Sequence, residues 1–163
     1  MMVEIEARPA TVRSDESAAR KRIGMPFVVK NTGESPCRLL GGYVGYHVAP
    51  APSPYGPDLM RGDSRSLELS AQVLAPGQAV PFGSETIPSE DASRIDGVLE
   101  GRERLWLVGR VDYEDASGEL FSTGYARCFS QDSHTFEESP DAAFWNHRGP
   151  MRADVAGHYG RKV

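Results

Sequence analysis

The chain has 163 residues, of which 39% are hydrophobic and 25% charged, and it carries a formal net charge of −5 at pH 7. This length accommodates one domain with a modest core, and the acidic balance disfavours non-specific binding to nucleic acid. No apolar run approaches the roughly 20 residues of a membrane-spanning helix, and residues 1–9 lack the apolar stretch of a secretory signal peptide.

The first part of the chain predicts strands separated by turns. Residues 3–7 alternate apolar and acidic side chains, which is typical of a half-buried edge strand. Residues 14–22 fit a short helical turn and a loop equally well. Residues 25–30 predict a second strand, and the Asn, Gly and Pro of residues 31–36 predict a tight turn after it.

Residues 39–48 predict a strand that contains three glycines, and these indicate a bulge or bend. Two inward-facing sets fit it: Leu39, Tyr43 and Tyr46, or Val44 and Val48. The prolines that follow exclude a central strand from residues 49–64, because proline donates no ladder hydrogen bond.

The middle of the chain predicts short strand pieces over residues 66–69 and 72–74, a Pro-Gly turn over 75–78 and an edge strand over 79–82. One helix is predicted after it. Ser89 is the expected N-cap and Gly97 the expected stop, and Ile95, Val98 and Leu99 are expected to dock on a sheet.

The strongest pattern is a hairpin formed by residues 105–113 and 120–129, joined through Gly118. Leu107, Val111 and Tyr113 fall on one predicted face of its first strand, together with Leu105. Trp106, Val108, Arg110 and Asp112 fall on the other. After Ser130 the pattern fades, although the aromatic pair at residues 144–145 is expected to fold back onto the domain.

Many short strands with Gly/Pro turns predict an all-β fold, specifically an immunoglobulin-like antiparallel β-sandwich with one short helix and irregular termini. The predicted organisation is an N-terminal edge strand and basic segment (1–24), the sandwich domain (25–130) and an irregular C-terminal segment (131–163).

Three motifs carry a resemblance to a known group of proteins. Residues 28–36 resemble an NTGxxPA strand and turn, residues 74–78 an LxPGQ turn, and residues 107–129 a GRVxYxDxxG hairpin. Together they resemble an uncharacterised proteobacterial family in which an immunoglobulin-like domain usually follows N-terminal membrane helices. The resemblance implies a fold and an extracytoplasmic position if a membrane helix precedes this segment, and a cytoplasmic one otherwise. It implies no reaction and no catalytic residue.

Cysteine and histidine spacing predicts no metal site. Cys37 and Cys128 form no CxxC pair, and free thiols are favoured over a disulfide between them. The histidines have no HExxH spacing, and solvated histidines are favoured over a zinc or copper site built from Asp132, His134 and His147. No cofactor motif for dinucleotides or nucleoside triphosphates is present.

The densest acidic cluster is Asp112, Glu114 and Asp115 at the end of the first hairpin strand. Two carboxylates on one strand face fit glycoside hydrolysis, and carboxylate oxygens also suit calcium. Acidic residues are, however, common in hairpin turns, where Asp binds its own backbone. A metal-binding or hydrolytic protein is therefore the alternative hypothesis, and no catalytic or metal-ligating residue is assigned.

The favoured function is a non-enzymatic binding or protein-interaction module. The predicted contact residues are aromatic and charged side chains on neighbouring strands and on the proline-rich loop: Tyr43, Tyr46, Tyr55, Trp106, Arg110 and Asp112. A protein partner is expected to bind through an edge strand or the 49–64 loop. A homodimer built on a shared edge strand is a further possibility.

Overall fold

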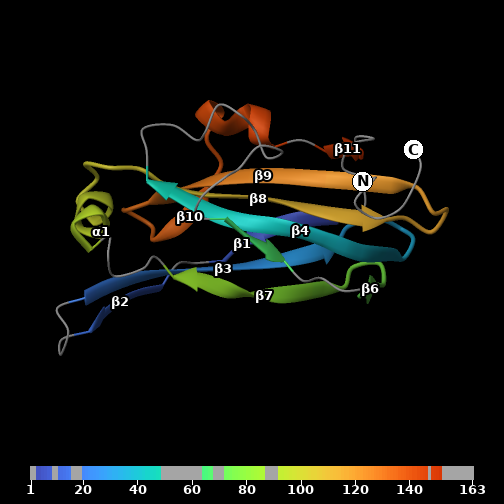
Figure 1. The fold of residues 1–163 in the computed structure, drawn as a ribbon, viewed down its shortest axis with the longest axis horizontal. Helices are drawn as coiled ribbons and strands as arrows, with labels where there is room; N and C mark the ends of the chain where they lie inside the picture. Colours follow the sequence, from blue (N-terminus) through green and yellow to red (C-terminus); the bar gives the residue numbers. More distant parts are fainter. Residues whose placement is uncertain are drawn as a thin grey trace.

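The structure is a computed structural model that describes residues 3–8, 11–15, 20–48, 64–67, 72–86, 92–146 and 148–151. Its strands form two antiparallel sheets, which lie as two layers in Figure 1. The all-β fold predicted from the sequence is thereby confirmed. None of the helices in the described ranges is long and apolar enough to cross a membrane.

The four-stranded sheet is organised around one long strand. It contains β1 (Val3–Ala7), β2 (Thr11–Asp15), β3 (Arg20–Asn31) and β7 (Ala79–Thr86). β1 and β2 pair with opposite halves of β3, and β7 pairs with it over residues 24–30. The expected strands at residues 3–7 and 25–30 are confirmed.

Neither the helical turn nor the loop considered for residues 14–22 is correct where these residues are described. Residues 14 and 15 belong to β2, and the strand β3 already begins at Arg20. Main-chain pairing between these two strands satisfies the backbone groups that a helix would have bonded locally. A domain boundary after residue 24 would fall inside β3.

The seven-stranded sheet carries the predicted hairpin at its centre. It contains β4 (Cys37–Val48), β5 (Ser64–Leu67), β6 (Val73–Leu74), β8 (Leu105–Glu114), β9 (Leu120–Ser130), β10 (Thr135–Glu137) and β11 (Arg148–Pro150). β8 lies between β4 and β9. Gly118 has a φ of 87° in the hairpin turn, as the sequence predicts.

The main core lies between the two sheets. Phe27 of β3 and Tyr125 of β9 meet across it with ring centroids 6.2 Å apart. The predicted inward face of β8 is confirmed, because its alternate side chains are all buried in this core: Leu105, Leu107, Val111 and Tyr113. At one side of the sandwich the Thr123 hydroxyl donates a hydrogen bond to the Val3 carbonyl at 3.3 Å.

A bulge decides which face of β4 is inward. The pairing with β8 shifts register between Leu39 and Gly41, so the side-chain alternation changes phase there. As a result Leu39, Val44 and Tyr46 all enter the core. Tyr43 does not belong to this core. The bulge was predicted. Of the two predicted inward sets, that of Val44 and Val48 agrees with the structure, because Val44 is buried in this core and Val48 packs against it, whereas the other set is wrong at Tyr43.

The helix α1 (Ala92–Leu99) is confirmed, and it packs Ile95 and Val98 into the core. The predicted stop at Gly97 is wrong, because the helix continues past this residue. It ends at Leu99, and Gly101, whose φ is 74°, lies in the turn that follows. The Arg102 amide donates to the Gly97 carbonyl and the Gly101 amide to the Val98 carbonyl, which is the Schellman arrangement.

Asn31 ties the turn after β3 to the strand β6. Its buried carboxamide nitrogen donates to the carbonyls of Ser35 and Leu74, both at 2.9 Å. Its side-chain oxygen accepts a hydrogen bond from the Gly33 amide at 2.9 Å. The predicted turn is therefore also a link between the two sheets, since β6 continues through the Pro-Gly turn into β7.

The segment after Ser130 is more regular than predicted. It forms β10, the 3₁₀ helix η3 (Pro140–Trp145) and β11, and both strands pair with the outer edge of β9. η3 covers the face of the seven-stranded sheet that points away from the other sheet (Figure 1). There Ala142 packs with Trp106, Val108 and Ala126. Residues 152–163 and the side chains of residues 144 and 145 lie outside the described part.

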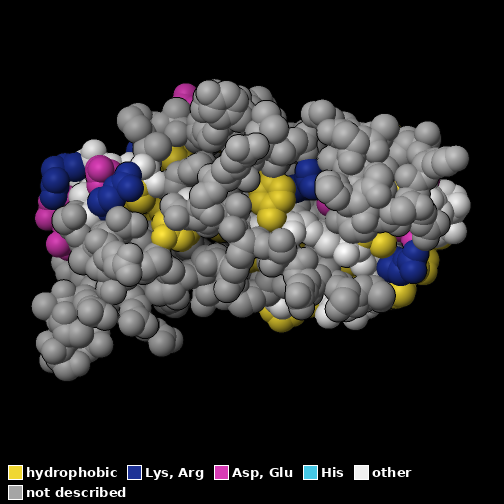
Figure 2. Space-filling view, viewed as in Figure 1, with side chains coloured by type: hydrophobic (Ala, Val, Ile, Leu, Met, Phe, Trp, Pro, Cys, Tyr) yellow, Lys and Arg dark blue, Asp and Glu magenta, His cyan; other side chains and the backbone are white. Residues whose placement is uncertain are grey.

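The molecular surface carries charges of both signs at one end. Figure 2 shows basic and acidic side chains side by side at the end of the molecule where α1 lies, and further charged and hydrophobic side chains at other described positions of this face. The segment after α1 contains an ion pair between Glu100 and Arg102 at 2.5 Å.

Candidate functional site

Three of the predicted contact residues meet on the outer face of the seven-stranded sheet. Tyr43 of β4 lies opposite Arg110 of β8, whose guanidinium lies 5.2 Å from the centroid of the tyrosine ring. Arg110 Nε lies 3.0 Å from Asp112 Oδ1, and the two side chains are only 12% and 0% exposed. This arrangement is a buried ion pair beside an aromatic ring, and it presents little of itself to a partner.

The structure does not bring the other predicted contact residues to this group. Tyr46 is buried in the core on the opposite side of β4. Trp106 is fully buried beneath η3, and the Arg104 guanidinium lies 4.5 Å from its ring. Tyr55 and most of the 49–64 loop lie outside the described residues.

The carboxylates of the acidic cluster each have a separate partner. Asp112 pairs with Arg110, and Glu114 forms an ion pair with Arg38 of β4. Asp115 instead belongs to the hairpin turn. Its Oδ1 accepts hydrogen bonds from the Ser117 hydroxyl and from the amides of Ser117 and Glu119. These bonds, the one from the Ser117 hydroxyl above all, hold the pKa of Asp115 below its usual value.

The residues considered for metal binding are also apart. His134 stacks on Phe129 with ring centroids 5.9 Å apart, and nothing can be said of the side chains of His47 and His147, which lie outside the described part. Within the described ranges no three His, Cys, Asp or Glu side chains form a group that could hold a metal ion.

Both cysteines are free thiols, as favoured from the sequence. Cys37 points into the main core, and burial raises the pKa of its thiol to about 11. Cys128 packs against the cluster around Trp106 on the other side of the seven-stranded sheet. The sheet itself therefore separates the two sulfur atoms.

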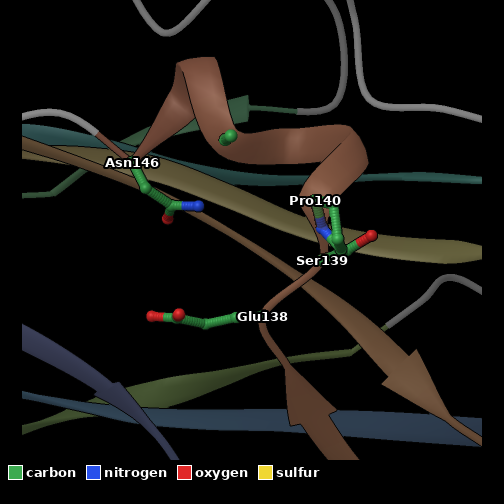
Figure 3. A pocket seen from close by; sticks show the side chains of 5 residues that line it. Glu138, Ser139, Pro140 and Asn146 are labelled. Atoms are coloured by element: carbon green, nitrogen blue, oxygen red, sulfur yellow. The ribbon is translucent and has the colours of Figure 1, made fainter.

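A pocket of about 410 Å³ opens between η3 and the segment leading into it. It is lined by Glu138, Ser139, Pro140, Ala143 and Asn146. Figure 3 shows the side chains of Glu138 and Asn146 reaching toward the same space, with Ser139 and Pro140 at the start of η3. No residue of this pocket was predicted as a contact.

Arg127 contacts two of the residues that line the pocket. Its Nη1 donates to Asn146 Oδ1 at 2.6 Å and to the Ala126 carbonyl at 2.9 Å. Its Nη2 lies 3.1 Å from Glu138 Oε1. The Arg127 side chain is 14% exposed, whereas that of Glu138 is 77% exposed. Burial lowers the pKa of Arg127.

Asn146 supplies a hydrogen-bond partner for the part of the β9 edge that lies between β10 and β11. β10 pairs with residues 128–130 and β11 with residues 121–123. Between them the Ala126 amide donates to Asn146 Oδ1 at 3.0 Å, and Asn146 Nδ2 donates to the Ala142 carbonyl at 3.1 Å. Asn146, which lines the pocket, is thus bonded both to β9 and to η3.

Arg104 fixes the start of η3. Its Nη2 donates to the Ser139 hydroxyl at 3.2 Å and its Nη1 to Asp141 Oδ2 at 2.7 Å. The hydrogen bond to Asp141 raises the pKa of Arg104. A signal for η3 is present in the sequence, because Ser139, Pro140 and Asp141 form a helix start with proline in the first turn.

Comparisons with known proteins define no family for this chain. No family model matches it. It is 33% identical over 88 residues to the aspartate carbamoyltransferase catalytic subunit of Frankia casuarinae, a match that covers 53% of this chain and 27% of that protein. The chain therefore spans about a quarter of the length of this curated relative, and the relative's activity is not carried over.

Two solved structures resemble it weakly. One is described as the ApaA protein from Bordetella pertussis, with a TM-score of 0.47, 12% identity and coverage of 77% of this chain and 90% of that one. The other is a structural genomics target with a TM-score of 0.42, 11% identity and coverage of 92% and 95%. Both TM-scores lie below 0.5, and neither similarity bears on function.

Proposed function

We propose that this chain is a non-enzymatic protein-interaction module, built on an immunoglobulin-like β-sandwich, that contacts its partner at the pocket beside η3. Two antiparallel sheets around one shared core support the sandwich assignment, as do the three motifs that resemble the proteobacterial family. The pocket supports the binding role because polar side chains line it, and two of them contact Arg127 of β9.

One observation carries the proposal: the polar side chains of the pocket are held by guanidinium groups. The Ser139 hydroxyl accepts a hydrogen bond from Arg104, and the Glu138 carboxylate is paired with Arg127. Activation of a serine requires a base that takes its proton, and a guanidinium stays protonated in proteins. This arrangement pairs the side chains of the pocket with cations and does not prepare a nucleophile.

The edge of β7 is a less suitable surface for a partner. Asn31 donates to the Gln78 carbonyl, and the next pairs toward β7 are Lys30–Ala79, Val29–Val80 and Val28–Pro81. Antiparallel pairs alternate, so the backbone groups of Ala79 and Pro81 point away from β3. Proline has no amide hydrogen, and an added strand would lose a hydrogen bond there.

A photo-crosslinking amino acid placed at Ala143 tests the proposal. Ala143 is exposed and lines the pocket. The matched control is the same substitution at Ala116, an exposed alanine in the hairpin turn. In an extract of the source organism we expect a discrete crosslinked protein for the Ala143 variant alone, which then binds the unmodified chain after purification.

Identical products from both variants, or none from either, would contradict the module proposal. The alternative of a metal-binding or hydrolytic protein has its own readout. Calcium, zinc or manganese would have to raise the melting temperature of the chain, and Asp112→Asn would have to abolish that increase. Light scattering of the purified chain tests the homodimer.

A further inference from the structure

Arg127 has binding capacity that its present contacts do not use. Within the described part of the chain both of its hydrogen bonds leave from Nη1. The Nη2 group has one close carboxylate, Glu138, at 3.1 Å. The guanidinium is held in place by the β9 backbone and by Asn146, so it is oriented in advance for a planar acceptor that reaches Nη2.

Glu138 is the exposed partner of this pair. It lies in the short connection between β10 and η3, and its side chain is 77% exposed. An ion pair with one highly exposed member contributes little free energy, because solvent screens it and the long side chain loses rotamer freedom. Rotation of Glu138 into solvent therefore costs little, while Arg127 stays where it is.

Nearby charges favour an anion at this point. Arg148 of β11 is close enough to lower the pKa of Arg127 by like-charge repulsion. Glu4 of β1 has the opposite effect, but it pairs with Arg148 at 3.2 Å. If Glu138 rotates into solvent, Arg127 loses its closest carboxylate.

We infer that Arg127 is a carboxylate-recognition site and that Glu138 occupies it in the free protein as an internal substitute for a carboxylate of the partner. The group already seated on Nη2 is a carboxylate, which shows that this geometry accepts one. A peptide carboxylate would replace it, with Asn146 keeping the guanidinium oriented and Pro140 and Ala143 contacting the neighbouring peptide chain. This inference rests on the proposed interaction function and names the chemistry of its partner.

The test is titration of the full chain with short peptides, followed by NMR of the Arg127 Nε–H and Asn146 side-chain signals. The probes are acetyl-Ala-Glu-Ala-amide, acetyl-Ala-Gln-Ala-amide and acetyl-Ala-Ala-Ala with a free C-terminus. The first and third probes distinguish a side-chain carboxylate from a terminal one. We expect a carboxylate probe to shift these signals and the Gln probe to leave them unchanged.

Glu138→Gln removes the internal competitor and should tighten binding of the carboxylate probe about two- to fivefold, the range expected from a surface ion pair. Glu137→Gln is the matched control, because it changes the net charge equally on the exposed neighbouring residue. Arg127→Lys should weaken binding, provided that circular dichroism shows the same fold.

Equal binding of the Glu and Gln probes, or equal tightening by both glutamate variants, would overturn the carboxylate site. These outcomes are separable from failure of the proposed function. If a partner crosslinks at Ala143 but shows no preference for carboxylates, the interaction function is supported and the carboxylate site at Arg127 is refuted. If carboxylate probes bind but no partner crosslinks at Ala143, the carboxylate site is supported and the proposed interaction function is refuted.

Discussion

The contribution of Asn31 to stability can be worked out from its contacts. Asn31→Ala removes two donated hydrogen bonds and one accepted bond, all at 2.9 Å. Each such bond contributes about 0.5–1.5 kcal/mol net, and the buried Leu74 carbonyl would lose its side-chain partner. We therefore expect the free energy of unfolding to fall by about 3 kcal/mol. In a chain of this size that corresponds to about 6–12 °C in melting temperature.

The assay is urea unfolding followed by circular dichroism and tryptophan fluorescence, with the exposed Glu34→Ala as the control in the same turn. Glu34→Ala should change the free energy of unfolding by less than about 0.5 kcal/mol. Asn31→Asp keeps an acceptor for the Gly33 amide but cannot donate to the two carbonyls, so it should destabilise at least as much as alanine. A loss below about 1 kcal/mol for Asn31→Ala, or tolerance of Asn31→Asp, would refute the reasoning.

Three further predictions concern the core and the seven-stranded sheet. Gly42→Ala would place a Cβ atom 2.1 Å from the Arg110 carbonyl oxygen, so we expect the free energy of unfolding to fall by more than about 3 kcal/mol. The control is Gly149→Ala, whose Cβ atom meets no atom within 4 Å and which should leave thermal unfolding unchanged. Burial raises the pKa of Cys37 from 9.0 to about 11, so its stabilising contribution is complete below pH 9 and is lost as the pH rises toward 11. Urea unfolding at pH 8 and pH 10.5 should show about 2 kcal/mol of this loss in the native chain and not in Cys37→Ala; equal pH slopes would contradict the assignment. Asp112→Ala removes the buried carboxylate that pairs with Arg110, and it should lower the free energy of unfolding by about 3–5 kcal/mol. The double variant Arg110→Met/Asp112→Leu should cost less in the same unfolding assay, and an equal or larger cost would show that the charged pair itself stabilises the sheet.

The sequence predicts local structure well where neighbouring residues decide it. The hairpin of β8 and β9 follows from strict alternation on both sides of a turn with Gly118. The Asn31 turn follows from Asn31, Gly33 and Pro36 within one short segment. Prediction is poorer at β2 and at the end of α1, where strand pairing with β3 and the conformation of Gly101 override the local pattern.

The candidate site is beyond such local reasoning. Arg127 lies within the predicted strand 120–129, and no contact role was predicted for it. Its role depends on Glu138 and Asn146, which lie 11 and 19 positions further along the chain. The helix start at Ser139 could have been recognised, but the pocket exists only because η3 folds back over β9.

Alternation of side chains and the turn residues by themselves determined that this chain forms antiparallel strands with one buried face, because both properties are fixed within a few consecutive residues. Tertiary structure alone decided that Tyr43 faces outward, since the bulge in β4 is defined by its pairing with β8. It also decided that each buried acid pairs with an arginine and that Arg127 meets Glu138 at a pocket. Such contacts join separate elements, and their geometry depends on how the two sheets and η3 pack together.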